Sequence, residues 1–318
     1  MAVSTSASSS SRALKIGIIG FGPFGQFLAK TMIKQGHILR ATCRTDHSQL
    51  CHHLGILFFR DKRAFLEADN DVILISISIL SLSEVLESLP FHCIKRPTLV
   101  VDVLSVKEYP RDVLLQVLPE EMDVLCTHPM FGPESGKDGW KNLAFVYEKV
   151  RIRDEATCSN FLHIFRSEVR KLVFFFFFLS LSGNSIPSIK PHLQTNSRRN
   201  IKVERIKARL RKAGCKMLEM SCEEHDKVAA KSQFLTHTIG RTLSEMDIHS
   251  TSMNTKGFET LVQLKESSVR DSFDLFGGLF IHNRFAKQEL QNLELALQKV
   301  KQKLQLSMEE QSSKESKL

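Results

Sequence analysis

A strand, a glycine-rich turn and a helix follow one another near the start of the chain. Residues 15–19 are apolar and β-branched, as in a buried parallel strand, and the next six residues read Gly20-Phe21-Gly22-Pro23-Phe24-Gly25. A helical apolar pattern then begins. In this context G-x-G-x-x-G predicts a dinucleotide site, in which the glycines allow a tight turn, a close phosphate and close helix packing. The alternative is a glycine turn that binds no ligand.

The second predicted strand, 38–44, ends in Arg44-Thr45. NAD enzymes usually place an acid there for the ribose 2′-hydroxyl, whereas a guanidinium and a hydroxyl suit a 2′-phosphate. The sequence therefore favours NADP. Asp46 follows directly and keeps NAD open as an alternative.

Further strands are predicted at 71–79, 98–107 and 144–152, and residues 123–133 begin as a strand and end in a loop that carries His128, with helical patterns between these segments. This alternation indicates an α/β fold, a Rossmann-type doubly wound parallel sheet. Ligands of such sheets bind beyond the carboxyl ends of the strands. Those ends carry Ser76, Ser78, Ser105 and His128, of which the first two are candidates for cofactor binding.

Five segments carry a resemblance to a known family: "VDVLSVKE", "CTHPMFGPESGKDGW", "MSCEEHD", "KSQFLTHTIGRTL" and "NTKGFETL". With these, the chain resembles the plant arogenate/prephenate dehydrogenases of tyrosine biosynthesis, in their non-plastidic branch. The resemblance implies a Rossmann domain followed by an all-helical C-terminal domain for substrate binding and dimerisation, and hence a homodimer. It also implies oxidative decarboxylation, in which hydride passes to the nicotinamide and the ring loses CO₂ and becomes aromatic.

The same resemblance assigns roles to residues of this sequence. His128 matches the family's catalytic histidine, which accepts the proton of the 4-hydroxyl, and Ser105 matches the serine that orients it. His237 matches a second active-site histidine, and Gln233 lies one helical turn before it. Without the resemblance, a lone loop histidine is more often a surface residue.

The substrate carries two carboxylates, so the family site needs cations. Arg241 continues the helix face of 233 and 237, although this spacing also suits a surface charge. Bacterial relatives place an arginine where this chain has Gly278, which puts the transfer of their carboxylate clamp in doubt. Lys256 is an alternative cation, acting within one chain or across the dimer.

Arogenate carries an amino group where prephenate carries a keto group. Asp271 matches a position where plant arogenate enzymes resemble one another in having Asp and prephenate-preferring relatives have Asn. A carboxylate favours an ammonium over a keto acid, so we expect arogenate as substrate. The alternative role for Asp271 is the N-cap of the helix that begins "SFDLF".

The basic charge of the chain is confined to one segment. The net charge is +9, and residues 169–213 hold eleven Lys or Arg and one acid, Glu204, which leaves the remainder near neutral. This segment also contains five consecutive phenylalanines and has no counterpart in the family. Val169-Arg170 is compatible with a splice-donor sequence, so we interpret 169–213 as a retained intron or gene-model error. The basic charge is then no sign of nucleic-acid binding.

The domain boundaries expected from these patterns are a disordered tail 1–13, a Rossmann domain 14–222 interrupted by 169–213, a helical domain 223–306 and a disordered tail 307–318. The amphipathic segment before the last tail is expected to be a packed or dimer-contact helix. No apolar run is long enough for a membrane helix. The seven cysteines show no metal-ligand spacing, and we expect no metal and mostly buried, reduced thiols.

The expected location is cytoplasmic. The final Ser316-Lys317-Leu318 matches a peroxisomal signal and makes the peroxisome the alternative, with a plastid less favoured. The expected function is that of an NADP-dependent arogenate dehydrogenase. The alternatives are a prephenate dehydrogenase, another dehydrogenase of the same two-domain plan, an inactive product of the retained intron, and a nucleic-acid-binding protein.

Overall fold

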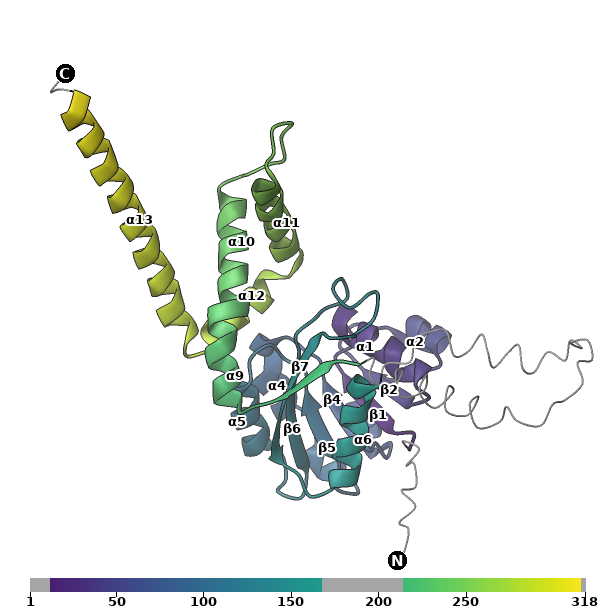
Figure 1. Cartoon of the computed structure of the whole chain (residues 1–318). Helices are drawn as coiled ribbons and strands as arrows, with labels where there is room; N and C mark the ends of the chain where they lie inside the picture. The colour runs from purple at the N-terminus through teal and green to yellow at the C-terminus, as the bar shows by residue number, and fades with distance from the viewer. Residues whose placement is uncertain (1–11, 168–213, 316–318) are drawn as a thin grey trace, which may run out of the picture. The chain divides into compact units, whose positions relative to one another are not determined.

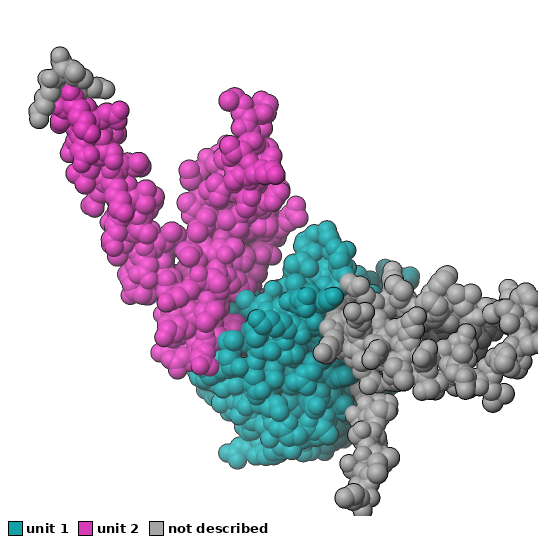
Figure 2. All heavy atoms as spheres, in the orientation of Figure 1, with its two compact units in different colours: residues 1–77, 81–105, 110–221 teal, residues 78–80, 106–109, 222–318 magenta. Residues whose placement is uncertain are grey.

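The computed structural model describes residues 12–167 and 214–315. Most of the predicted N-terminal tail, the whole of 169–213 and the C-terminal tripeptide therefore lie outside the described residues. Two compact units make up the described chain (Figure 2). Unit 1 draws on 1–77, 81–105 and 110–221, and unit 2 on 78–80, 106–109 and 222–318.

Unit 1 is built on one eight-stranded sheet, whose strand order is β3-β2-β1-β4-β5-β6-β7-β8 (Figure 1). The neighbouring strands from β3 to β6 are parallel, and β7 is antiparallel to β6. The prediction of a doubly wound sheet is confirmed, but the sheet is mostly rather than wholly parallel. The strands are β1 (Lys15–Ile19), β2 (Ile38–Thr42), β3 (Leu57–Phe59), β4 (Val72–Ile75), β5 (Leu99–Asp102), β6 (Asp123–Pro129), β7 (Ala144–Arg151) and β8 (Lys216–Glu219).

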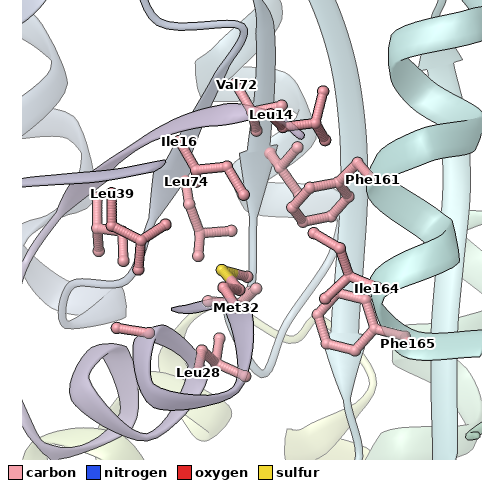
Figure 3. Close-up of a cluster of buried hydrophobic side chains, with 14 of the residues drawn as sticks. Leu14, Ile16, Leu28, Met32, Leu39, Val72, Leu74, Phe161, Ile164 and Phe165 are labelled. Atoms are coloured by element: carbon pink, nitrogen blue, oxygen red, sulfur yellow. The ribbon is translucent and has the colours of Figure 1, made fainter. Parts of the chain in front are cut away.

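The core of unit 1 lies between the sheet and two helices that cover the same face of it (Figure 3). Helix α1 contributes Leu28 and Met32, and helix α6 contributes Phe161 and Phe165, all fully buried. Burial of each such side chain stabilises the fold by about 1.5–3 kcal/mol. The helical elements up to residue 166 are α1 (Pro23–Lys34), α2 (Ser48–Leu54), α3 (Lys62–Glu67), η1 (Ile79–Ser81), α4 (Leu82–Glu87), η2 (Phe91–Cys93), α5 (Glu108–Val117) and α6 (Glu155–Arg166).

From residue 222 onward the described chain of unit 2 contains helices and connecting loops and no strand, which confirms the predicted helical C-terminal domain. Its first long helix consists of three consecutive pieces, α9 (Cys222–Ala229), the π-helical turn η3 (Ala230–Phe234) and α10 (Leu235–Glu245). Helix α10 packs along α11 (Lys256–Arg270). The chain then forms α12 (Phe273–Ile281) and α13 (Ala286–Glu315).

Helix α13 differs from the prediction in its length. It includes residues 307–315, for which the sequence predicts a disordered tail. Glu, Gln, Lys and Met are good helix formers, and they extend the preceding turns without a Gly or Pro to stop them. No helix among the described residues is long and apolar enough to span a membrane.

Candidate functional site

The glycine turn after β1 is shaped by the end of β4. Gly20 has φ +89°, and a Cβ at this position would lie 2.2 Å from the Ser76 carbonyl oxygen. A Cβ on Gly25 would lie 2.6 Å from the carbonyl oxygen of Gly20 and 3.3 Å from Ser76 Oγ. A Cβ on Gly22, in contrast, would meet no atom within 4 Å. Two glycines therefore allow close packing, and the third leaves open space beside the backbone.

This open space lies at the N-terminus of helix α1. Gly22 is the N-cap, Pro23 begins the helix, and the first turn contains no acidic residue. Phe24 is partly buried against Phe27. The strand order reverses between β1 and β4 at the same edge of the sheet, which is where doubly wound folds bind nucleotides. Free amides and a positive dipole end suit a pyrophosphate, so the residues of this turn fit the expected dinucleotide.

The residues that follow β2 lie on the surface. Arg44 and Thr45 are both exposed. The Asp46 carboxylate accepts a hydrogen bond from the backbone N–H of Ser48, at 2.8 Å, at the start of α2. This bond is the main cause that lowers the pKa of Asp46. Asp46, which favoured NAD in the sequence, thus has a structural partner, while Arg44 has no ion pair among the described residues.

The two predicted catalytic residues of unit 1 lie within β6 and just after the neighbouring strand β5. His128 is buried inside β6, opposite Val146 of β7, and not in the loop that the sequence predicts. Ser105 is partly buried three residues beyond Asp102, the last residue of β5, and β5 pairs in parallel with β6. Both residues therefore lie toward the carboxyl edge of the sheet. The orientation of His128 by Ser105 stays a prediction.

In unit 2, three predicted substrate residues share one helix face at four-residue spacing. Gln233 lies in the π-helical turn η3, and His237 and Arg241 lie in α10. Each has a buried polar atom without a hydrogen-bond partner, namely Gln233 Oε1, His237 Nδ1 and Arg241 Nε. Buried polar atoms are normally paired, and π-helical turns are frequent at functional sites. Three such atoms on one face indicate a place prepared for a polar ligand.

Asp271 lies beside this face. Its carboxylate oxygen Oδ2 is 3.8 Å from His237 Nε2, and its carbonyl oxygen accepts a 2.7 Å hydrogen bond from Arg241 Nη2. Burial lowers the pKa of His237, with Asp271 opposing this change and Arg241 adding to it. The N-cap of α12 is Ser272, whose Oγ accepts from the Leu275 N–H. The alternative role of Asp271 as that cap is therefore wrong.

The guanidinium of Arg241 is held in place by three groups. Besides its bond to Asp271, it lies over the rings of Phe273 and Phe276, 5.5 and 5.1 Å from their centroids. Two aromatic faces and one carbonyl restrict the rotamers of the arginine, and no carboxylate among the described residues forms an ion pair with it. This arrangement suits a cation that binds an anionic ligand.

Two other positions of unit 2 behave differently. Lys256 is exposed in the first turn of α11, and no hydrogen bond or ion pair among the described residues joins its side chain to Gln233, His237 or Arg241. A Cβ on Gly278 would lie 3.1 Å from Ile79 Cβ. A side chain at 278 would therefore crowd Ile79.

Ser78, which the sequence predicts to bind the cofactor, is exposed and belongs to unit 2.

The sequence analysis missed two residues, Arg60 and Asp226. Arg60 follows the three-residue strand β3 and donates from Nη1 to the carbonyl oxygen of Arg44, at 3.4 Å. Buried Asp226 of α9 accepts from the N–H groups of Lys107 and Glu108, at 2.7 and 2.9 Å. Arg60 could not be predicted because β3 is too short to recognise in the sequence. Asp226 could not be predicted because its hydrogen-bond partners lie more than 100 residues away in the chain. No cluster of three metal-binding side chains occurs among the described residues.

The glycine turn predicts different effects for two matched substitutions. Gly22→Ala meets no neighbouring atom and has an ordinary φ of −72°, so we expect its free energy of unfolding to stay within about 0.5 kcal/mol of the parent. The methyl group occupies the space of the pyrophosphate and should weaken NADP and NAD binding by about tenfold or more. Gly20→Ala should instead lose about 1–3 kcal/mol of stability, because its φ is positive and Ser76 is close. Urea unfolding and fluorescence titration measure both; unweakened binding by Gly22→Ala would contradict the site.

His237 predicts a pH dependence of stability. An unfolded histidine takes up a proton near pH 6.5, whereas burial keeps folded His237 neutral to lower pH. Below about pH 6.5 the unfolded state therefore binds more protons, and the free energy of unfolding falls as the pH falls. His237→Gln should lose less stability between about pH 7.5 and 5.5 than the parent. Urea unfolding across this range measures the loss of stability, with the exposed His249→Gln as control. Equal losses in His237→Gln and the parent would show that the pKa of His237 is not lowered in the folded state.

Comparison with known proteins identifies two sequence families along the chain. The model of the prephenate dehydrogenase nucleotide-binding domain matches residues 28–157. The model described as the TYRAAT1-like C-terminal domain matches residues 242–316.

Two solved structures show a similar fold. Prephenate dehydrogenase from A. aeolicus, in complex with hydroxyphenyl propionate and NAD+, aligns with a TM-score of 0.60 at 17% identity, over 96% of this chain and 94% of that one. Synechocystis arogenate dehydrogenase aligns with a TM-score of 0.53 at 16% identity, over 93% of each chain. At these identities the likeness establishes the fold alone.

Two curated relatives from Arabidopsis thaliana are much closer in sequence. Arogenate dehydrogenase 1, chloroplastic, is 46% identical over 306 residues, which are 95% of this chain and 41% of that protein, so the chain spans less than half of its length. Arogenate dehydrogenase 2, chloroplastic, is 44% identical over 298 residues, 92% of this chain and 71% of that protein. The identity to this second relative and the share of it that is covered place the chain in the arogenate/prephenate dehydrogenase family.

Proposed function

We propose that this protein is an NADP-dependent arogenate dehydrogenase, which converts L-arogenate to L-tyrosine with release of CO₂. The observation that carries the proposal is the face of Gln233, His237 and Arg241, with its three unpartnered buried atoms and Asp271 beside it. A polar substrate with two carboxylates and an ammonium offers partners both for these buried polar atoms and for the Asp271 carboxylate. The two Arabidopsis relatives are named for the same activity.

The proposed chemistry needs little covalent work from the protein. The nicotinamide, when bound at the glycine turn, supplies the hydride acceptor. His128 accepts the proton of the substrate 4-hydroxyl and returns one to the phenolate oxygen of the product. The bond to the ring carboxylate breaks, its electron pair enters the ring, and CO₂ leaves. Because aromatisation drives the reaction, the main contribution of the side chains is to position the substrate.

The polar residues of unit 2 have distinct roles in this proposal. Arg241 is fixed by Phe273, Phe276 and the Asp271 carbonyl, and its unpartnered Nε is suited to a substrate carboxylate. Neutral His237 offers Nδ1 to a hydroxyl or carboxylate group. Asp271 attracts the ammonium of arogenate and repels the keto acid of prephenate. Prephenate dehydrogenase activity is the alternative, and Asp271 is the residue that separates the two.

The substrate proposal is tested by an assay that crosses arogenate and prephenate with NADP and NAD. We expect the highest kcat/KM with arogenate and NADP. Asp271→Asn should lower kcat/KM for arogenate by about tenfold or more and raise it for prephenate, because it removes one charge and leaves the Ser272 cap of α12 intact. Asp274→Asn, in the first turn of α12, is the control. An unchanged substrate preference in Asp271→Asn would refute the assignment.

The segment 169–213 requires a separate arm of the same assay. If it is a retained intron that inactivates the protein, a variant without 169–213 will be active and the full chain will not. If both are active, the inactive-product alternative fails.

We also propose that the protein is a homodimer whose contact includes α13. Leu290 and Leu293 of this helix are partly buried, but its later apolar side chains are exposed, with Leu297 at 70% and Leu304 at 63%. Figure 1 shows the helix diverging from α10 toward its C-terminus. An exposed apolar stripe of this length in a helix is typical of a surface that a second chain covers.

The dimer proposal predicts a mass change on substitution in α13. Leu297→Glu together with Leu304→Glu should convert a dimer to a monomer in light scattering, because charges would enter an apolar contact. Lys299→Glu together with Lys303→Glu, on the same exposed helix, is the control and should remain dimeric. A parent protein that is monomeric at micromolar concentration would contradict the proposal.

A further inference from the structure

Two arginines lie together at the carboxyl ends of β2 and β3. The strands pair in parallel with Thr42 opposite Phe59, so Arg44 and Arg60 both follow the last pair of the ladder. Arg60 Nη1 donates to the carbonyl oxygen of Arg44, at 3.4 Å, and both residues are exposed. The backbone of one arginine thus fixes the side chain of the other at the same corner of the sheet.

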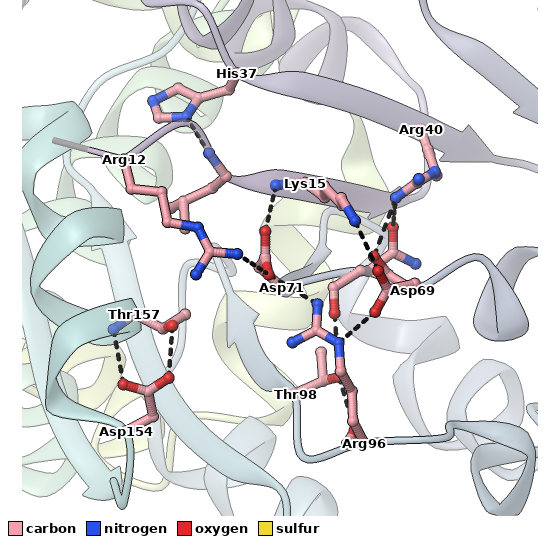
Figure 4. A network of polar contacts seen from close by, with 12 residues as sticks. Arg12, Lys15, His37, Arg40, Asp69, Asp71, Arg96, Thr98, Asp154 and Thr157 are labelled. Carbon is pink, nitrogen blue, oxygen red and sulfur yellow. Dashed lines mark hydrogen bonds and ion pairs between the residues drawn. The ribbon is translucent and has the colours of Figure 1, made fainter.

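Arginines at the opposite edge of the sheet have a different environment (Figure 4). There Arg96 pairs with Asp71 at 2.7 Å and also with Asp69, and Arg40 donates to Asn70 Oδ1 at 3.0 Å. At the carboxyl edge neither Arg44 nor Arg60 has an ion pair among the described residues. Two arginines at one corner of the sheet, one of them with its side chain against the backbone of the other, give this corner a positive potential, which favours an anion.

The acid nearest in sequence does not cancel this potential. Asp46 lies two residues after Arg44, and Arg60 is one of the charges that lower its pKa. Its carboxylate nevertheless accepts from the Ser48 N–H and makes no ion pair with either arginine. This corner therefore holds two arginines and one acid that is already hydrogen-bonded at the start of α2, and an excess of positive charge remains.

We propose that Arg60 is a specificity-determining residue that binds the 2′-phosphate of NADP together with Arg44. The inference rests on the proposed function, because it presupposes the preference for NADP. The adenosine ribose of a dinucleotide lies at the end of the second strand of such a sheet, and NADP differs from NAD there by one phosphate. A phosphate carries two charges near neutral pH and has three acceptor oxygens, so a second guanidinium adds charge-assisted hydrogen bonds that a hydroxyl cannot match.

The test measures ligand binding by the full chain and needs no catalysis. Adenosine 2′,5′-bisphosphate and adenosine 5′-monophosphate are titrated calorimetrically into the parent and into Arg60→Gln, Arg44→Gln and Arg63→Gln. Arg63 is a nearby exposed arginine that pairs with Glu67 at 3.8 Å, and its variant is the matched control. We expect Arg60→Gln to weaken bisphosphate binding by about tenfold or more. Binding of the monophosphate should be unchanged, as should both affinities of Arg63→Gln.

The outcomes separate this inference from the proposal on which it rests. A parent without preference for the bisphosphate overturns the NADP preference and Arg60's role with it. A preference that Arg44→Gln reduces and Arg60→Gln does not overturns the role of Arg60 alone. Equal weakening of both ligands by Arg60→Gln also overturns it, because the effect then lies outside the 2′-phosphate. Arg60→Lys, which keeps the charge, should recover part of the affinity that Arg60→Gln loses.

Discussion

The close contact between the β1–α1 turn and the end of β4 is the constraint on which the nucleotide half of this protein depends. Gly20 lies so near the Ser76 carbonyl that only a residue without Cβ fits, and a Cβ on Gly25 would also be too close to the Gly20 carbonyl. These contacts bring the start of α1 directly over the strand ends where the sheet order reverses. The amides of the helix, the serine after β4 and the arginines after β2 and β3 consequently share one edge of the sheet.

Much of this arrangement can be predicted from local sequence, and the misses have physical causes. The strand–glycine–helix pattern predicts β1 and α1 because each residue acts on its immediate neighbours. The strand β3 has only three residues, too few to show the alternating pattern of a strand, so the sequence does not place Arg60 at a strand end. The antiparallel direction of β7 is set by its pairing with β6. The apolar pattern of a strand is the same for parallel and antiparallel pairing, so the sequence of β7 does not predict its direction.

In unit 2 the same distinction separates what spacing predicts from what tertiary contacts decide. Four-residue spacing predicts that 233, 237 and 241 share one face, but the π-helical turn that contains Gln233 is not visible in the sequence. Asp271 and Ser272 are both good N-caps by residue type, and only the structure shows that Ser272 takes that role. Asp271 is thereby left with its carboxylate directed at His237, a distinction that residue preferences alone cannot supply.

The charges of the molecule are divided between stability and binding. At the amino edge of the sheet, Asp71 accepts from Lys15 N and Arg96, and these charge-assisted bonds add about 1.5–3 kcal/mol each to stability. In the part of the chain that the structure describes, Arg44, Arg60 and Arg241 form no ion pair with a carboxylate, and buried atoms of Gln233 and His237 have no hydrogen-bond partner. A buried polar group without a partner lowers the free energy of unfolding, and a ligand that binds it in the folded state offsets this cost. The proposed substrate and cofactor should therefore both raise the stability of this protein, in a manner that depends on their anionic groups.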